Sequence, residues 1–361
     1  MYFYKYSIEY KIKRMGVDVF MKKINLLLTA AATTLLFMAC GGKDEGTTTA
    51  AKEATPVTIQ IGYENNPGEP FDLACKEWKR LIEERSNGTM KAETFPSSQL
   101  GSKNDLIDQM IAGDSVITLA DGAFYADRGV ADMGITFGPY FFSSWDEAWK
   151  LIESDWWKSQ TDILEKNGLK MVAANWVYGD RHTLSKKPIR KVEDFAGLKI
   201  RVPNNAIQVR GFEVLGATPT PMPLGDTYTA LQQGTIDGLE NPLPVLYNGK
   251  FQEVAKYLTL DAHVKNFTTL ICGTAFFNTL TPEQQQILLE TAKEAGEYNN
   301  KLQAELTADL LEKFKAEGVE IIEVNTDSFK EKAMKFYELP EFTSQWSQDL
   351  YNTVSQAKAV K

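Results

Sequence analysis

Residues 57–121 read "VTIQIGYENNPGEPFDLACKEWKRLIEERSNGTMKAETFPSSQLGSKNDLIDQMIAGDSVITLAD", and this stretch decides the fold. Short runs rich in alternating or continuous apolar residues predict strands, and two longer runs repeat apolar residues at helical spacing. The predicted strands are 57–63, 89–95 and 115–121, and the predicted helices are 71–88, ending at Gly88, and 104–114. A strand–helix–strand–helix–strand order predicts a parallel sheet with helices on its faces. Ligands in such sheets bind beyond the carboxyl ends of the strands.

A second series of the same kind begins near Arg181. Its parts are "LKIRVP" (198–203), a helix within 205–215 ending at Gly216, "TPTPMPL" (218–224), a helix over 226–233 ending at Gly234, and "IDGLENP" (236–242). The chain has 361 residues, which is too long for one typical hydrophobic core. The sequence therefore predicts two α/β domains.

The strongest helix signal follows Thr281, a natural N-cap, with Pro282 in the first turn and Gln284 completing a capping box. No proline interrupts the pattern before Gly318. A helix of roughly 35 residues would reach about 50 Å at 1.5 Å per residue. This length exceeds one small domain, so the helix is expected to run along both.

Composition narrows the class of function. The chain is 43% hydrophobic and 24% charged, which is typical of globular proteins. Its net charge of −9 and the lack of a basic patch argue against nucleic acid as a partner, while a local site can still bind an anion. No HExxH, CxxC, GxSxG, GxGxxG or GxxxxGK[ST] motif occurs, so the usual carriers of metal, nucleophile and phosphate chemistry are missing. This pattern favours a binding protein that closes around its ligand, without cofactor or metal, over an enzyme.

The N-terminus predicts export. Two lysines follow Met21, an apolar run extends over 24–39, and "FMAC" before Cys40 resembles the cleavage site of a lipoprotein. Residues 1–39 are interpreted as a signal peptide, of which 1–20 fit no signal design and indicate an upstream false start. Lipidation of Cys40 would leave 40–56 as a flexible tether to the membrane. The alternative is an ordinary secretory signal with an incidental cysteine.

Cys75 and Cys272 are the remaining cysteines. In an exported protein they could form a disulfide, but sequence cannot show that their Cα atoms come within reach. Two buried free thiols are the favoured interpretation.

Arg201 is the first candidate binding residue. Side chains alternate along a strand, so Arg201 faces away from Ile200 and Val202, and Pro203 ends the strand. A guanidinium at this position suits a carboxylate ligand, because its planar fork matches two carboxylate oxygens. An inter-domain salt bridge or a solvated strand end would explain the residue equally well from its context alone.

The run "GLKIRVPNNAIQVRGFEVLGATPTPMPLGDTYTALQQGTIDGLENPL" (197–243) resembles the second-domain core of solute-binding proteins of tripartite ATP-independent periplasmic (TRAP) transporters. "FPSSQLGS", "YGDRHTLSKKPI" and "KFQEVAKYL" also match that family, and the similarity covers roughly residues 57–345. The resemblance implies a periplasmic binding protein-like α/β fold of two domains with crossing strands and a long helix that spans both. Domain I would comprise 57–178 and 267–306, and domain II would comprise 179–266 and 307–361.

The resemblance also implies function: the protein would capture an organic acid in the periplasm and deliver it to a membrane permease driven by an ion gradient. Together with the predicted lipid on Cys40, this makes the expected mature protein a membrane-tethered monomer. Arg201 would grip the ligand carboxylate, Arg181 would be a second ligand-contacting arginine, and Asn241 would help fix the carboxylate. Structural alternatives are an ion pair of Arg181 with Asp180 and turn chemistry at Asn241 before its proline.

Glu64 and Asp121 lie where two predicted strands end, as a site for ligand hydroxyl groups would require. Sialic-acid binders of the family carry Asn and Glu at these positions, so sialic acid is disfavoured. Two acidic groups beside two arginines suit a monosaccharide acid, such as a uronate, an aldonate or a keto-gulonate, better than a dicarboxylate. Trp176 and Phe124 are candidate walls of the site. Other classes left open are an exported hydrolase that uses Glu64 and Asp121, and a solute sensor for a membrane receptor.

Overall fold

The structure is a computed structural model that describes residues 56–359, so the predicted signal peptide and Cys40 lie outside the described residues. The strands are β1 Val57–Gly62, β2 Met90–Phe95, β3 Val116–Ala120, β4 Leu169–Ser185, β5 Lys199–Val202, β6 Thr218–Pro221, β7 Gly238–Pro242, β8 Tyr257–Gly273 and β9 Glu320–Glu323. The α-helices are α2 Pro70–Arg85, α3 Lys103–Ala112, α4 Gly122–Ala126, α5 Trp145–Ile152, α6 Asp155–Lys166, α7 Ala206–Leu215, α8 Leu224–Gln233, α9 Leu243–Asn248, α10 Thr274–Phe277, α11 Pro282–Ala308, α12 Leu310–Ala316, α13 Asp327–Ala333, α14 Pro340–Thr343 and α15 Leu350–Ala357. Short 3-10 helices are η1 Ala131–Phe137, η2 Val192–Phe195, η3 Phe251–Glu253 and η4 Met334–Glu338.

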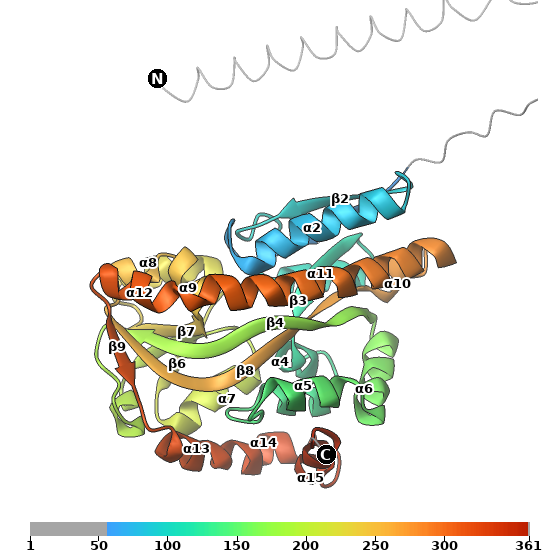
Figure 1. Cartoon of the computed structure of the whole chain (residues 1–361). Helices are drawn as coiled ribbons and strands as arrows, with labels where there is room; N and C mark the ends of the chain where they lie inside the picture. The colour runs from blue at the N-terminus through green and yellow to red at the C-terminus, as the bar shows by residue number, and fades with distance from the viewer. Residues whose placement is uncertain (1–55, 360–361) are drawn as a thin grey trace, which may run out of the picture. The chain divides into compact units, whose positions relative to one another are not determined.

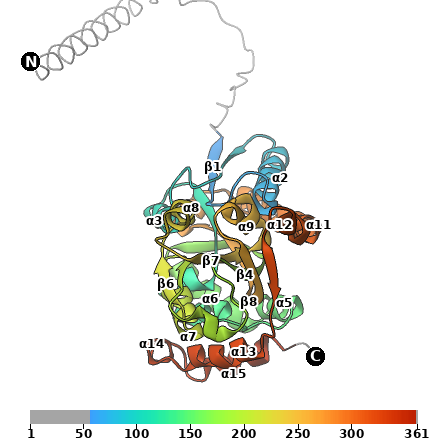
Figure 2. The same cartoon turned by 90° about the vertical axis from the view of Figure 1, so that its left-hand side faces the viewer.

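The sheet has two parallel sets of strands joined by two long crossing strands. Its order is β2-β1-β3-β8-β4-β7-β5-β6, with β9 on β8. β1 pairs in parallel with β2 and β3, and β5 pairs in parallel with β6 and β7, which confirms the two predicted strand–helix series. β4 and β8, of 17 residues each, are antiparallel and connect the two sets. The two-domain α/β fold with crossing strands is therefore present (Figures 1 and 2).

The long helix begins as predicted and ends differently. Thr281 and Gln284 form the capping box, and Pro282 opens the first turn of α11. The helix stops after 27 residues, and Asp309 separates α11 from the seven-residue α12. At Asp309 the backbone stays right-handed but departs from ideal helix angles, with φ −93° and ψ −6°, and Thr and Asp are weak helix formers. The prediction of one uninterrupted helix is therefore wrong, although α11 and α12 continue in line over β4 and β8 (Figure 1).

Trp176 belongs to the core rather than to a binding site, which corrects the expectation above. Its ring is fully buried on β4 and packs against Phe71 and Trp78 of α2. Its indole Nε1 donates to the carbonyl of Ala292 on α11, at 3.0 Å. Burying an indole with its one donor paired lets β4 hold α2 and α11 on one face of the sheet.

The C-terminal segment, expected in domain II, contacts helices expected in domain I. Trp346 Nε1 donates to the carbonyl of Ala131 at 3.1 Å, and Ser347 N donates to Asp132 at 2.8 Å. Lys358 pairs with Glu147 of α5 at 2.9 Å. The domain boundaries remain a prediction, and these contacts add a connection beside the two crossing strands and α11.

Cys75 and Cys272 are both buried and unpaired, in agreement with the favoured interpretation. Within residues 56–359, no helix combines the length and the apolar character needed to cross a bilayer.

Candidate functional site

All five predicted ligand-binding residues line one pocket, which we call the central pocket. Each comes from the end or the bend of a different strand: Glu64 follows β1, Asp121 follows β3, Arg181 lies on β4, Arg201 on β5 and Asn241 on β7. About 360 Å³ in and around the pocket is not filled by atoms, open solvent included. Its lining residues are Glu64, Lys103, Leu119, Asp121, Phe124, Tyr178, Arg181, Arg201, Pro203, Gln208, Leu224, Asn241, Asn266 and Thr268.

Arg201 is buried, with 2% of its surface exposed, on the face of β5 opposite Ile200 and Val202. Its Nε and Nη2 donate to one backbone oxygen, the carbonyl of Met222, at 3.0 and 2.8 Å. It forms no ion pair with any acidic side chain that the structure describes, so the salt-bridge alternative is not realised here. Burial lowers the pKa of Arg201, yet a guanidinium stays protonated in proteins. The geometry leaves a charged group whose remaining donors can serve a carboxylate.

Arg181 is also buried but has a partner within the protein. Its Nη2 donates to Glu240 Oε1 at 2.7 Å, and its Nε donates to the other oxygen of the same carboxylate. Its Nη1 donates to Asn266 at 3.0 Å. Asp180, the predicted alternative partner, instead pairs with Lys265 at 2.7 Å. Arg181 is therefore held rigidly where it lines the central pocket, with its charge largely balanced by Glu240.

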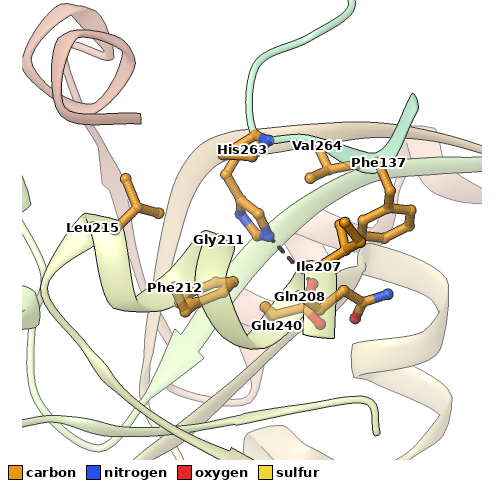
Figure 3. Close-up of a pocket in the computed structure, with 10 residues that line it drawn as sticks. Phe137, Ile207, Gln208, Gly211, Phe212, Leu215, Glu240, His263 and Val264 are labelled. Carbon is orange, nitrogen blue, oxygen red and sulfur yellow. Dashed lines mark hydrogen bonds and ion pairs between the residues drawn. The ribbon is translucent and has the colours of Figure 1, made fainter. Parts of the chain in front are cut away.

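A buried chain of charges continues behind Arg181. His263 of β8 places Nε2 3.2 Å from Glu240, and its ring meets Phe212 edge-on (Figure 3). On the other side of the ring, Nδ1 lies 3.1 Å from Asp261. Burial alone would raise the pKa of Glu240, but Arg181 and His263 lower it to about 2. Burial opposes the charged form of His263, but Asp261 and Glu240 raise its pKa to about 9. The chain therefore alternates positive and negative groups at neutral pH.

Asn241 is buried on β7, with 3% of its surface exposed. It lies opposite His182 of β4, and Pro242 lies opposite Arg181. A residue before proline is restricted to extended conformations, and this keeps Asn241 in strand β7. In this position Asn241 lines the central pocket together with Arg181. Asn241 therefore adds an amide beside the arginines.

Glu64 and Asp121 bring two carboxylates to the other wall of the pocket. Asp121 is the N-cap of α4, and its Oδ1 accepts from the amide of Ala123 at 3.0 Å. Burial raises the pKa of Asp121, while Lys103 and Arg181 oppose that rise. Phe124 lines the pocket as expected.

Sequence reasoning missed several lining residues: Lys103, Tyr178, Gln208, Asn266 and Thr268. Two of them had a usable signal, because Lys103 directly follows "FPSSQLGS" and Tyr178 begins "YGDRHTLSKKPI". Asn266 and Thr268 are two residues apart and therefore lie on the same face of β8. Only the pairing of β8 with β4 shows that this face is directed toward the pocket. Among residues 56–359, no cluster of three His, Cys, Asp or Glu side chains could hold a metal ion.

Two α/β domains around a polar, charge-lined pocket define a solute-binding protein of the class that closes around its ligand. Residues 61–343 match the model of bacterial extracellular solute-binding protein family 7, and the chain belongs to that family, which supplies TRAP transporters. Its members are solute-binding proteins rather than enzymes.

Relatives with named ligands are close enough to be informative. The 2,3-diketo-L-gulonate-binding periplasmic protein of Escherichia coli is 34% identical over 73% of this chain and 80% of its own length. A TRAP solute-binding protein from Ochrobacterium anthropi, solved with bound L-fuconate, is 45% identical, covers 84% of this chain and 100% of its own, and superposes with a TM-score of 0.81. A TRAP solute-binding protein from Actinobacillus succinogenes, solved with bound L-galactonate, is 39% identical to this chain. The match covers 84% of this chain and 99% of that protein, with a TM-score of 0.80.

Proposed function

We propose that this protein captures a hydroxylated monosaccharide acid in the periplasm and delivers it to a TRAP membrane permease. The observation that carries the proposal is the convergence of Glu64, Asp121, Arg181, Arg201 and Asn241 on one pocket. The ligand carboxylate would lie against Arg201, with Arg181 and Asn241 beside it. Glu64 and Asp121 would accept hydrogen bonds from hydroxyl groups of the ligand chain.

The relatives favour an open-chain aldonate as the ligand. L-fuconate is the 6-deoxy form of L-galactonate, so the two solved relatives bind acids of the same configuration at C2 to C5. Both of these relatives are more similar to this chain than the 2,3-diketo-L-gulonate binder is. We therefore place L-galactonate and L-fuconate ahead of uronates and keto acids as candidate ligands.

The experiment is a thermal-shift screen against aldonates, uronates, keto acids and dicarboxylates, followed by calorimetric titration of the hits. A ligand at 100 times its dissociation constant should add about 2.7 kcal/mol to the free energy of unfolding. Mass spectrometry of the ligand after incubation tests the hydrolase alternative, because a binding protein returns its ligand unchanged. Stabilisation by dicarboxylates alone would contradict the proposed ligand class.

A further inference from the structure

Lys103 occupies a position that a structural lysine would not favour. It is the first residue of α3, where the positive end of the helix dipole disfavours a cation. It is partly buried, and its ammonium lies 4.6 Å from the centre of the Phe124 ring. Burial lowers the pKa of Lys103, and the carboxylates of Asp121 and Glu64 only partly offset this.

Among residues 56–359, the ammonium of Lys103 also has no hydrogen-bond or ion-pair partner. Three other lysines with at most a quarter of the side chain exposed each pair with a carboxylate: Lys170 with Glu165 at 2.7 Å, Lys265 with Asp180 at 2.7 Å and Lys358 with Glu147 at 2.9 Å. Lys103 forms no hydrogen bond or ion pair with any residue that the structure describes, although Glu64 and Asp121 line the same pocket. Its donors are therefore free for a group that lies between these side chains.

The placement of Lys103 indicates which part of a ligand it would meet. It lines the central pocket and also a neighbouring pocket, together with Glu64, Phe124 and Arg201. Domain I thus presents one ammonium and two carboxylates toward the arginines of β4 and β5. An ammonium donates to hydroxyl oxygens and a carboxylate accepts from hydroxyl hydrogens, so the three side chains together suit a chain of hydroxyl groups.

We propose that Lys103 is a specificity-determining residue that binds hydroxyl oxygens of the ligand chain. Together with Glu64 and Asp121 it forms a wall that selects polyhydroxy acids with a single carboxylate. A second carboxylate would meet two negative charges and one positive charge, and the excess of negative charge disfavours it. This inference rests on the proposed function, because it takes the ligand carboxylate to lie at Arg201.

The binding test uses three acids that differ only at C6: L-fuconate with a methyl group, L-galactonate with a hydroxymethyl group and galactarate with a carboxylate. Calorimetric titration of the wild type should give at least tenfold weaker binding of galactarate than of L-galactonate. Lys103→Met keeps the side-chain stem and should weaken binding of L-galactonate and L-fuconate about 10- to 100-fold, as expected for loss of a charged hydrogen bond. Lys103→Arg should retain binding within about fivefold of the wild type.

A matched control is Lys166→Met, which removes an exposed lysine of α6 and should leave all affinities unchanged. Lys103→Met that binds L-galactonate and L-fuconate within threefold of the wild type would overturn the proposal. Galactarate that binds as tightly as L-galactonate would overturn the role assigned to the wall.

A second readout needs no ligand. If Lys103 serves the ligand, replacing it by Met removes an unpaired charge, and the melting temperature of the ligand-free protein should stay constant or rise. A fall of more than about 4 °C would assign Lys103 a structural role and overturn the proposal. If none of the three acids binds the wild type, the proposed choice of ligand is wrong. In that case a fall in the melting temperature of Lys103→Met would still overturn the role proposed for Lys103, and an unchanged or higher melting temperature would still support it.

Discussion

The carboxylate of Glu64, just after β1, accepts a hydrogen bond at 3.2 Å from the backbone amide of Leu224, the first residue of α8. The N-cap of α8 is Pro223, whose side chain cannot accept a hydrogen bond, so Glu64 satisfies a helix amide that the local sequence leaves open. The two residues are 160 positions apart and belong to different predicted domains. This contact can form only when the two domains are close together.

Removing the Glu64 carboxylate should speed ligand release. Losing a helix cap costs about 0.5–2 kcal/mol, so Glu64→Ala should raise the dissociation rate roughly 2- to 30-fold. Glu64→Gln keeps an acceptor oxygen and should lie between Ala and the wild type. Stopped-flow fluorescence measures the rates, and Glu93→Ala, an exposed glutamate on β2, is the control. An unchanged dissociation rate in Glu64→Ala would show that the contact does not hold the closed form.

Arg201→Ala should abolish binding at micromolar ligand concentrations while the fold persists. Removing one partner of a buried charged pair costs roughly 3–5 kcal/mol, which corresponds to about two to nearly four decades in affinity. Arg201→Lys should recover only part of the lost affinity, because an ammonium cannot make the planar bidentate contact with a carboxylate. Calorimetric titration and circular dichroism check both points. Binding of Arg201→Ala within threefold of the wild type would show that another residue holds the carboxylate.

Because of the buried imidazole of His263, the free energy of unfolding should decrease as the pH rises above neutral. Its pKa is raised to about 9 in the folded protein, against roughly 6.5 for an unperturbed histidine. The folded state therefore binds the extra proton, so this stabilisation is complete below pH 6.5 and is lost as the pH rises to 9. The loss should reach up to about 3 kcal/mol in the free energy of unfolding, measured by urea titration at several pH values.

Two histidine variants separate this effect from general destabilisation. His263→Gln should be less stable at neutral pH and should lose the alkaline decline. Burial lowers the pKa of His182, so its contribution has the opposite sign and falls as the pH decreases. His182→Gln should therefore keep the alkaline decline of the wild type. An alkaline decline that persists in His263→Gln would assign it to another group.

Cys40 should carry a lipid. Expressed from Met21 in a Gram-negative host, the protein should partition into detergent and incorporate a labelled fatty acid, because an apolar run and "FMAC" precede Cys40. Cys40→Ser should abolish the label. Labelling that survives this change would contradict lipidation at Cys40, and a wild-type protein without label would indicate an ordinary secretory signal.

A further expected outcome concerns domain closure. Small-angle scattering should give a smaller radius of gyration with a saturating ligand than without it, because crossing strands allow the two domains to rotate together. An equal radius in both states would show that the pocket is preformed. Glu64→Ala should shift the ligand-bound radius toward that of the free protein.

The sequence by itself determined the local elements and the ends of the strands. Apolar periodicity and caps such as Thr281 and Gly216 act within a few residues, so the parallel strands, α7 and the start of α11 could be predicted. The ends of parallel strands lie at one edge of a sheet, which is why the sequence could predict Arg201 and Asp121 as residues of one candidate site.

Only the tertiary structure decided which side chains are partners. Glu240 rather than Asp180 neutralises Arg181 because β4 pairs with β7, which brings together residues 59 positions apart. Trp176 lies in the core rather than in the pocket because β4 packs against α11, where its partner Ala292 is 116 positions away. In the part of the chain that the structure describes, Lys103 has no ion-pair partner although two carboxylates line the same pocket. Its surroundings come from the ends of β1 and β3 and from β5, which are brought together by packing and not by the neighbouring sequence.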